Sequence, residues 1–416
     1  MIRSVVVSKA LPPVPRPYSY AVKAGGFVFT AGLIGVDTTN AIVGATPGRP
    51  DVAAQTQRAL ENLTVALDAL GVPFAHAAQV KGYLTDFRHR DAYNAVYREM
   101  VKAPWPARAT VGAALVRDHV IVEIEAIVPV AGPAEEIRAP GLAPSKSPLS
   151  HGRRAGDLVF VSGQVARDPR GELVGRGDMR AQAEQALDNV GAVLAAAGLT
   201  FADVIKINGT VPDWYGFHPY NEIFMKYFTE PFPARATIQG ALGTEGALIE
   251  IEAVAARGPK RTVESVAPGV GHFALKRRAD TVYVSELPGA LAPHSHAVQV
   301  ADLVYLCGEV GYDASGHLVG PGAIRAQTRK TLENLKLCLS ALGGSMDDIV
   351  KTNVSLTDYR LVPGFNEEYA TFFTPPYPAR TTVVAGLAQS RMVIEIEAIA
   401  VLGASRTAVA VTGPAA

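Results

Sequence analysis

The segment PWPARATV at residues 104–111 occurs three times in this chain with small changes. It returns as PFPARATI at residues 231–238 and as PYPARTTV at residues 376–383. A segment that recurs at long intervals is the signature of a protein built from structural repeats. The chain is therefore expected to contain three copies of one domain. Each copy places an arginine at the same point of the motif, and these are Arg108, Arg235 and Arg380.

Other markers keep the same spacing. The acidic segment VEIEAI at residues 122–127 returns as IEIEAV at 249–254 and as IEIEAI at 394–399. A glutamine and an asparagine recur at the two intervals that separate the arginines. They are Gln55, Gln182 and Gln327, and Asn94, Asn221 and Asn366. Agreement of several markers in one register argues strongly against a chance repeat.

The order of elements within one repeat follows from its hydrophobic pattern. In the first repeat, Leu60, Leu63, Leu67 and Leu70 lie on one face of a predicted helix, and Gly71 ends it. The expected order is β-β-α-β-α-β-β, an α+β fold whose last two strands, ARATVGAAL and VIVEIEAIVPV, form a hairpin. Long helices cover one face of a sheet, so three sheets closing on each other would bury the remaining faces.

The markers divide the chain into three domains and one insertion. We expect the repeats at residues 1–132, 143–257 and 289–403. The second interval is longer because residues 258–288 form a linker insertion, with Pro, Gly, a basic cluster and one strand-like segment, TVYVSEL. The tail from about residue 404 is expected to fray.

Composition restricts the class of protein. Hydrophobic residues make up 48% of the 416 residues, enough for a core in every repeat. The formal net charge is zero, which argues against a nucleic-acid partner. Two cysteines, Cys307 and Cys338, make no disulfide framework. No apolar run is long enough for a membrane span or a signal peptide, so we expect a cytoplasmic protein without a membrane partner.

Taken in this order, the motifs resemble those of the RidA/YjgF/UK114 family of enamine/imine deaminases. The matching segments are the PYS-type start, the SGQ strand end, the helix with Q-x6-N, the PAR motif and the final EIEA strand. Family members are typically homotrimers with a central β-barrel and sites in the clefts between subunits. The resemblance implies a chorismate mutase-like RidA fold, in which one chain forms a monomeric pseudo-trimer around such a barrel.

The resemblance also implies a reaction and the residues that perform it. The family hydrolyses reactive enamine or imine intermediates to a 2-keto acid and ammonia, with no metal and no organic cofactor. Its substrate-binding arginine falls on Arg108, Arg235 and Arg380, and its water-positioning glutamate on Glu123, Glu250 and Glu395. A family cysteine is replaced by Thr110, Thr237 and Thr382. A hydroxyl still binds a carboxylate, but the identity of the substrate stays open.

These residue types suit that chemistry. A guanidinium holds a carboxylate through two parallel hydrogen bonds. A glutamate in a partly dry cleft orients a water and accepts its proton. The glutamate follows the arginine across the expected hairpin, which predicts that the two residues of one repeat lie on paired strands. The two glutamates of each E-x-E segment share a face of their strand. The alternative is an Arg–Glu pair that only ties the hairpin together.

The first hairpin of each repeat is expected to form a second wall of the pocket. Pairing around Ala24-Gly25 places Tyr18 opposite Ala31. The corresponding pairs are Leu149 with Ser162 and His294 with Cys307. The family usually has Tyr and Ser at these positions, which marks Tyr18 and Ser162 as expected substrate contacts. No repeat keeps both, so the three pockets are expected to differ in chemistry.

The third repeat leaves two main interpretations open. In one, His294 lowers the pKa of Cys307, and the thiol is a catalytic nucleophile near Arg380 and Glu395. In the other, Cys307 and His294 only fill the pocket wall. A metal bound by this pair together with His296 is less favoured, because the family has none.

Three classes of function follow from the sequence. The first, favoured by the resemblance, is a hydrolase that deaminates an enamine or imine of a small carboxylate. The second is a non-catalytic protein that binds a small ligand in the same clefts. The third is a biosynthetic tailoring enzyme that acts on a larger carboxylate. In each class the expected partner is a small molecule.

Overall fold

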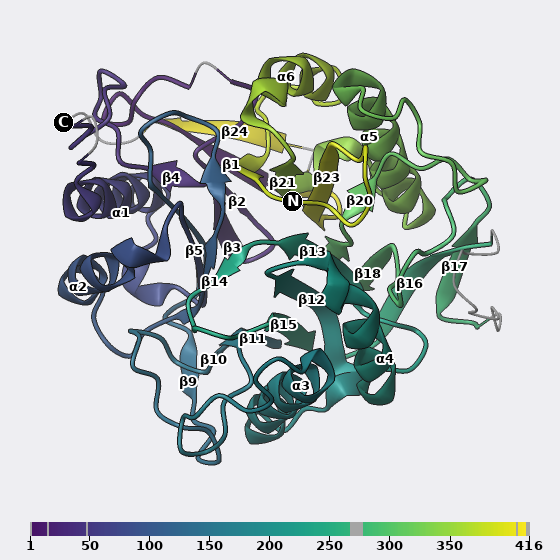
Figure 1. Cartoon of the computed structure of the whole chain (residues 1–416). Coiled ribbons are helices and arrows are strands. Elements are labelled where there is room, and N and C mark those ends of the chain that lie inside the picture. Colours follow the sequence, from purple (N-terminus) through teal and green to yellow (C-terminus); the bar gives the residue numbers. More distant parts are fainter. Residues whose placement is uncertain (1, 15, 47–48, 267–277, 405–406, 413–416) are drawn as a thin grey trace.

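The computed structural model describes residues 2–14, 16–46, 49–266, 278–404 and 407–412. Three repeats surround a common centre, with their strands toward the centre and a pair of helices on the outside of each repeat (Figure 1). The expected α+β architecture with three tandem copies is therefore present. None of the helices in the described residues is both long enough and apolar enough to span a membrane.

Repeat 1 shows the common plan. Its core consists, in chain order, of β2 (Ala21–Ala24), β3 (Phe27–Thr30), α1 (Val52–Asp68), β5 (Gln79–Leu84), α2 (Arg90–Met100), β6 (Ala107–Gly112) and β8 (Val122–Pro129). This is the predicted order β-β-α-β-α-β-β. Three further strands are β1 (Ile2–Val7), β4 (Leu33–Ile34) and β7 (Ala114–Leu115).

Repeats 2 and 3 follow the same plan. Repeat 2 comprises β9 (Glu135–Ile137), β10 (Gly152–Ala155), β11 (Leu158–Gln164), α3 (Met179–Ala196), β12 (Val204–Val211), α4 (Phe217–Tyr227), β13 (Ala234–Gln239), β14 (Ala241–Leu242) and β15 (Glu250–Ala256). Repeat 3 comprises β16 (Lys260–Ser265), β17 (Thr281–Val284), β18 (Ala297–Val300), β19 (Leu303–Leu306), β20 (Glu309–Val310), α5 (Ile324–Ala341), β21 (Ile349–Leu356), α6 (Val362–Ala370), β22 (Ala379–Val384) and β23 (Ile394–Val401). The last strand, β24 (Thr407–Thr412), follows.

Helix α1 illustrates how the sequence specifies these elements. The Asp51 side chain accepts a hydrogen bond from the first turn (3.0 Å), which caps the helix. Leu60, Leu63 and Leu67 are buried against the sheet. Gly71 follows with a φ of 68°, which glycine adopts without the steric cost that other residues pay. The predicted helix and its end are therefore confirmed.

The recurring glutamine joins helix α1 to a loop of its own repeat. The Gln55 side chain donates to the carbonyl oxygen of His119 (2.8 Å) and accepts from the backbone N–H of Ile121 (2.9 Å). Gln182 and Gln327 make equivalent bonds in the other repeats. This role is structural, and it fixes the loop that precedes each glutamate-bearing strand.

Each repeat builds a sheet with the same strand order. In repeat 1 the order is β6-β5-β8-β3-β2-β1. Repeats 2 and 3 repeat it as β13-β12-β15-β11-β10-β9 and as β22-β21-β23-β19-β18-β16. The predicted hairpin of the last two strands is wrong, because β5 lies between β6 and β8. Helix α2 carries the chain back so that β6 runs parallel to β5, as a crossover connection requires.

The expected central β-barrel is not present. The strands form two nine-stranded sheets and one six-stranded sheet, and in the described residues none of these sheets closes on itself. Short pairings connect neighbouring repeats instead: β14 of repeat 2 pairs with β6, and β7 of repeat 1 pairs with β22. The pseudo-trimer is thus three separate sheets that meet around one centre.

The chain ends and the insertion also differ from expectation. Strand β24 pairs in parallel with β1, so residues 407–412 extend the sheet of repeat 1 and do not fray (Figure 1). Within the insertion, β16 occupies the sheet position of β1 and β9, and β17 pairs with it. The insertion therefore supplies two strands, where the sequence predicted one. Its residues 267–277 lie outside the described part of the chain.

Candidate functional site

Three cavities open where one repeat meets the next, and each combines the arginine and threonine of one repeat with the glutamate of the following one. Cleft 1–2 (about 440 Å³) contains Arg108, Thr110 and Glu250; cleft 2–3 (about 230 Å³) contains Arg235, Thr237 and Glu395; cleft 3–1 (about 320 Å³) contains Arg380, Thr382 and Glu123. The nine residues that the PAR and EIEA motifs predicted therefore all line clefts between repeats.

The arginine and glutamate of one repeat, expected to lie together, are separated by the sheet. Arg108 and Ala126 both lie in register with Val80 of β5, so these three residues share a face. Glu123 is an odd number of residues from Ala126 and lies on the opposite face. The predicted pair within one repeat is wrong, and so is the alternative in which that pair ties a hairpin together.

Backbone contacts across the repeat boundary bring each arginine to its new partner. The N–H of Arg108 donates to Ser162 Oγ of repeat 2 (2.8 Å). The carbonyl oxygen of Arg235 accepts from the N–H of Gly308 (3.0 Å), and that of Arg380 accepts from Gly32 (3.3 Å). Each arginine-bearing strand is therefore held against the first hairpin of the next repeat.

An asparagine and two aromatic rings hold the arginine in cleft 1–2. Arg108 is 3% exposed, and its guanidinium carbon lies 4.7 Å from the Tyr97 ring centre and 5.4 Å from that of Tyr93. Its Nη2 donates to Asn94 Oδ1 (2.7 Å). Its Nε and Nη1 have no hydrogen-bond partner among the described residues. Two buried donors are therefore free to bind an anion.

Cleft 3–1 repeats this arrangement. Arg380 donates from Nη2 to Asn366 Oδ1 (2.8 Å), and it lies over the rings of Phe365 and Tyr369. The ring of Tyr18, from repeat 1, is 5.6 Å from the same guanidinium. Burial lowers the pKa of Arg380 to about 10. The recurring asparagine, whose role the sequence left open, orients the arginine of its own repeat in these two clefts.

Cleft 2–3 differs. The Arg235 guanidinium lies between the rings of Tyr220 (4.3 Å) and Phe224 (4.5 Å) and is almost fully buried. Within the described residues none of its three nitrogens has a hydrogen-bond partner, and Asn221 Oδ1 is unpaired as well. Burial lowers the pKa of this arginine. This guanidinium has more nitrogens without a hydrogen-bond partner than those of Arg108 and Arg380, and an anionic ligand would pair them.

The three glutamates share one electrostatic environment. Two causes raise the pKa of Glu123, Glu250 and Glu395 to about 8 in each case. The larger is burial, and the smaller is repulsion from the second glutamate of the same E-x-E segment. Each glutamate therefore holds a proton over much of the neutral range. Such a group exchanges protons readily near pH 7, as a general acid or base must.

A glycine in each repeat makes room for the glutamate. A Cβ built on Gly32 would overlap Glu123 Oε1, and Gly163 and Gly308 stand in the same relation to Glu250 and Glu395. The sequence motif SGQ contains the second of these glycines. A glycine recurs at this position in all three repeats, and that recurrence is the sequence signal for the close approach.

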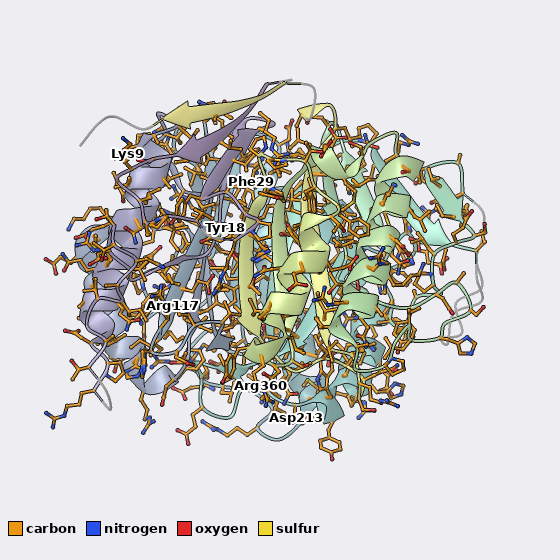
Figure 2. The ribbon with its side chains drawn as sticks, turned by 90° about the horizontal axis from the view of Figure 1, so that it is seen from above. Lys9, Tyr18, Phe29, Arg117, Asp213 and Arg360 are labelled. Carbon is orange, nitrogen blue, oxygen red and sulfur yellow. The ribbon has the colours of Figure 1, made fainter. Side chains whose placement is uncertain are left out.

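Of the two substrate contacts predicted on the first hairpins, Tyr18 lines its cleft and Ser162 does not. Tyr18 lines cleft 3–1, where repeats 1 and 3 meet (Figure 2). Ser162 is not among the residues that line cleft 1–2. Its hydroxyl accepts from Arg108 N–H and donates to the Ser150 carbonyl oxygen, so it is occupied by backbone. The hydroxyl of Ser162 thus joins two repeats.

The register of the first hairpin is two residues away from the predicted one. Gly25 and Gly26 form the turn, with φ values of 56° and 80°, so Tyr20 lies opposite Ala31. In repeat 3 the same shift places His296, and not His294, opposite Cys307. Side chains alternate with period two along a strand, so a shift of two keeps each residue on its face. His294 and Leu149 therefore still line their clefts.

Cys307 does not have the properties of an activated nucleophile. It is 1% exposed, and its Sγ–H donates to Glu309 Oε1 (3.2 Å). Its neighbour Gly308 lines cleft 2–3 with Arg235 and Glu395, so the expected neighbour Arg380 belongs to a different cleft. Burial and the Glu309 carboxylate raise the pKa of the thiol well above its usual value. The expectation of a lowered pKa is therefore wrong. His294 stays neutral, because burial lowers its pKa to about 3.

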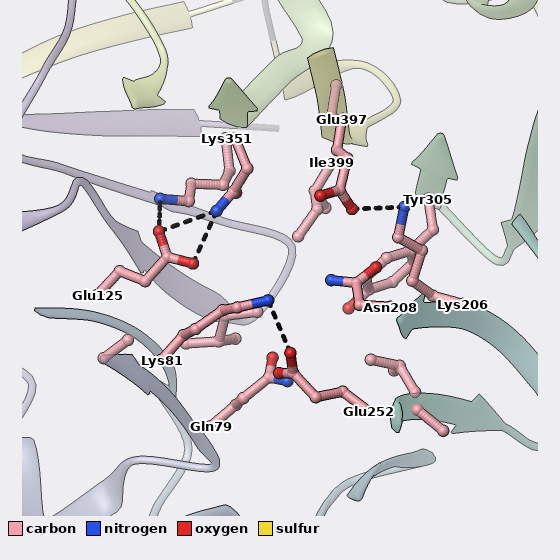
Figure 3. Close-up of a pocket in the computed structure, with 16 residues that line it drawn as sticks. Gln79, Lys81, Glu125, Lys206, Asn208, Glu252, Tyr305, Lys351, Glu397 and Ile399 are labelled. Atoms are coloured by element: carbon pink, nitrogen blue, oxygen red, sulfur yellow. Dashed lines mark hydrogen bonds and ion pairs between the residues drawn. The ribbon is translucent and has the colours of Figure 1, made fainter. Parts of the chain in front are cut away.

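A small polar cavity of about 60 Å³ lies between the three repeats and is lined by lysines and glutamates (Figure 3). The pairs are Lys81 with Glu252 (2.6 Å), Lys206 with Glu397 (2.7 Å) and Lys351 with Glu125 (2.7 Å). Each pair joins two repeats. The second glutamate of every E-x-E segment thus faces the centre, while the first faces a cleft.

Comparison with known proteins agrees with this architecture. The family model described as Endoribonuclease L-PSP matches residues 8–130, 141–257 and 284–402. The chain belongs to this family. Relatives named 2-iminobutanoate/2-iminopropanoate deaminase match its repeats, and the resemblance seen in the sequence is confirmed. Each RidA-like repeat accounts for one of the three matches.

Relatives of the RidA family match about one repeat each. Human 2-iminobutanoate/2-iminopropanoate deaminase is 39% identical over 125 residues, which is 30% of this chain and 89% of the relative. Protein DfrA of Myxococcus xanthus is 42% identical over 101 residues, or 24% of this chain and 77% of that protein. A chorismatase structure is 13% identical, has a TM-score of 0.54, and covers 78% of this chain and 93% of its own; this likeness concerns the fold alone.

Proposed function

We propose that the clefts hydrolyse a reactive enamine or imine of a small carboxylate to a keto acid and ammonia. The observation that carries the proposal is the same in all three clefts. An arginine with free donors among the described residues lines one cavity with a glutamate whose pKa is about 8; Glu123 and Glu395 are buried, and Glu250 is half-buried. The names of relatives such as the human deaminase support the same class of reaction.

The arginine binds the substrate carboxylate. The unpaired Nε and Nη1 of Arg108 can donate charge-assisted hydrogen bonds to a carboxylate, and Asn94 holds the guanidinium in place through Nη2. Thr110 lines the same cavity and adds a hydroxyl. This contact fixes the distance from the carboxylate to the C=N carbon, which presents that carbon to the glutamate of the next repeat.

The glutamate moves the protons. Its neutral carboxyl group donates a proton to the imine nitrogen, or to the β-carbon of an enamine, and the product is an iminium ion. The resulting carboxylate accepts a proton from a water whose oxygen adds to the iminium carbon. The tetrahedral adduct then releases ammonia as its C–N bond breaks and the hydroxyl becomes a carbonyl. The glutamate is a proton carrier throughout, and no group is oxidised or reduced.

Turnover of an imino acid generated in situ tests the proposal. An amino-acid oxidase produces the imine continuously, and keto acid and ammonia are measured with and without the protein. We expect acceleration that falls when Arg108, Arg235 and Arg380 are all replaced by Met. Carboxylate binding without any acceleration over buffer would contradict the proposal and favour the non-catalytic binding protein.

A second candidate applies to cleft 1–2 alone. This cavity is the largest of the three, and Arg90, Arg98 and Arg167 line it in addition to Arg108. A larger or more highly charged carboxylate therefore suits cleft 1–2 better than cleft 2–3, because apolar side chains such as Met392 and Leu291 line the wall of cleft 2–3. A tailoring reaction on such a substrate predicts turnover that depends on Arg108 but not on Arg235.

The proposal keeps the other expectations drawn from the sequence. The partner is a small carboxylate, not a nucleic acid or a membrane, and the chain acts as a monomer. These statements stay predictions, as does the absence of a cofactor from the reaction itself.

A further inference from the structure

Both cysteines of the chain lie in one buried cluster beside cleft 2–3. The cluster consists of His294, His296, Cys307, Glu309 and Cys338. Four of its members are at most 2% exposed, and His294 is partly exposed and lines the cavity. Thiol, imidazole and carboxylate groups are the side chains that bind zinc-like ions. Here five of them come together from the segment before β18, the segment between β19 and β20, β20 itself and α5.

The corresponding positions in the other repeats hold few such groups. Repeat 1 has Tyr18, Tyr20, Ala31, Leu33 and Ala66, and repeat 2 has Leu149, His151, Ser162, Gln164 and Val193. The fold therefore accepts apolar or neutral residues at every one of these positions. Repeat 3 has potential ligands at all five positions, where repeat 2 has only His151, and packing alone does not require them.

The geometry separates the cluster into ligands and a supporting group. The ligand atoms of His294, His296 and Cys307 lie within 4.8 Å of one another. A tetrahedral zinc ion holds its N and S ligands about 3–4 Å apart, so the three side chains must move closer together to bind one ion. Glu309 Oε1 lies 2.5 Å from His296 Nδ1. A carboxylate bound to the second ring nitrogen is the usual support of a metal-binding histidine.

We propose that His294, His296 and Cys307 bind a zinc-class transition-metal ion, with Glu309 orienting His296. His296 Nε2, which now lies 3.0 Å from the Pro288 carbonyl oxygen, exchanges that contact for the metal. Cys307 loses its proton to solvent on binding. The fourth position faces the cavity that His294 and Arg235 line, so a water or a ligand carboxylate completes the coordination.

The competing account is a buried ion pair. In that account His296 is protonated and bound by Glu309 and Pro288, and the cysteines are core residues. It explains the His296 contacts, but it gives no role to the neutral His294 beside Cys307. The two accounts differ in one measurable property, which is stoichiometric binding of a metal through the thiolate.

Cobalt is the probe for this difference. The reduced, metal-free full-length protein is titrated with Co²⁺, and the thiolate-to-cobalt absorption band is followed in the near ultraviolet. We expect one ion per chain, a spectrum of four-coordinate cobalt, and loss of the band on adding Zn²⁺. Absence of binding at that stoichiometry overturns the proposal and leaves the ion pair.

The chain itself supplies matched variants, because repeat 2 shows which side chains the fold accepts. Cys307→Ser should abolish the band, and His294→Leu should weaken zinc binding by more than the about 10–100-fold expected for Glu309→Gln. Cys338→Val is the control and should keep the band. Circular dichroism melts verify folding. A band that persists in Cys307→Ser, or that is lost in Cys338→Val, overturns this ligand set.

Discussion

Arg380 of the third repeat and Glu123 of the first line one cavity, although they lie far apart in the sequence. The same relation joins Arg108 to Glu250 and Arg235 to Glu395. Each cleft thus depends on a boundary between repeats, and cleft 3–1 depends on the contact between the last repeat and the first. Strands β1 and β24 lie side by side at that boundary.

The first prediction tests this pairing by double substitution. In a background with Arg235 and Arg380 replaced by Met, only cleft 1–2 retains its arginine. Arg108→Met should weaken binding of a small 2-keto carboxylate by about 2–5 kcal/mol, because the partner anion loses a desolvated, charge-assisted contact. Calorimetry measures the affinity.

The coupling free energy between Arg108 and each glutamate, measured on ligand binding, then shows whether the arginine works with the glutamate of the next repeat or with that of its own repeat. Coupling between Arg108→Met and Glu250→Gln should exceed about 0.5 kcal/mol, and coupling with Glu123→Gln should be near zero. The latter glutamate is the matched control, since it lies in the same repeat as the arginine. Stronger coupling with Glu123 would contradict the pairing across repeats.

The second prediction concerns assembly. Each chain already contains the three repeats that surround the centre, and its lysine–glutamate pairs join all three. We therefore expect a monomer near 43.8 kDa in sedimentation velocity. A full-length homotrimer that persists at low protein concentration would show that the repeats do not complete one another within a chain.

The third prediction is a pH dependence of stability. Glu250 has a pKa of about 8 in the folded protein, against a usual value of 4.5. Its contribution is fully present below pH 4.5 and is lost as the pH rises from 4.5 through 8, because in this range the unfolded state gives up its proton while the folded state keeps it.

Urea unfolding of the Glu250→Gln variant measures this effect. Between about pH 5 and pH 8 the unfolding free energy of the unmodified protein should fall relative to that of the variant, by up to about 1.4 kcal/mol per pH unit. Glu245→Gln, at an exposed position, serves as the control. Parallel pH profiles for all three proteins would refute the raised pKa.

The sequence predicted the fold through its repeats, because PAR, EIEA and the recurring glutamine carry local information about strand ends and helix contacts. It did not predict the strand order. Whether β6 pairs with β8 or with β5 depends on the crossover through α2, and an apolar strand pattern is compatible with both. The error about the arginine's partner follows directly from this one.

Other features of the site depend on contacts between distant segments. The aromatic rings that hold Arg108 come from α2, where Tyr93 and Tyr97 look like core residues in the sequence. The central lysines give no local signal at all, since Lys351 meets its partner Glu125 only when the third repeat packs on the first. The predicted register of the first hairpin differs from the observed one by two residues. The turn consists of Gly25 and Gly26, so the first pair is Ala24 with Phe27, whereas the prediction centred the turn on Ala24-Gly25.

The fourth prediction tests the central lysines. Lys351 Nζ lies 2.7 Å from Glu125 Oε2 and also donates to the Thr30 carbonyl oxygen (2.8 Å). Lys351→Met should destabilise the protein by about 3–5 kcal/mol, since it leaves a buried carboxylate without its cation. The double variant with Glu125→Gln should recover part of this loss. Urea unfolding measures both. Equal stability of the single variant and the unmodified protein would mean that the pair does not hold the repeats together.

The last prediction concerns thiol reactivity. Cys307 and Cys338 are both buried, and burial with the nearby Glu309 carboxylate raises the pKa of each well above its usual value. Because the thiolate is the reactive form, both should react slowly and at similar rates with iodoacetamide at neutral pH. Peptide mass spectrometry of the metal-free protein follows each site, and guanidinium-unfolded protein gives the rate of free thiols. His294→Leu should leave the rate at Cys307 nearly unchanged, because a neutral imidazole does not stabilise a thiolate. Fast labelling of Cys307 alone, slowed by His294→Leu, would instead show the activated nucleophile that the sequence suggested.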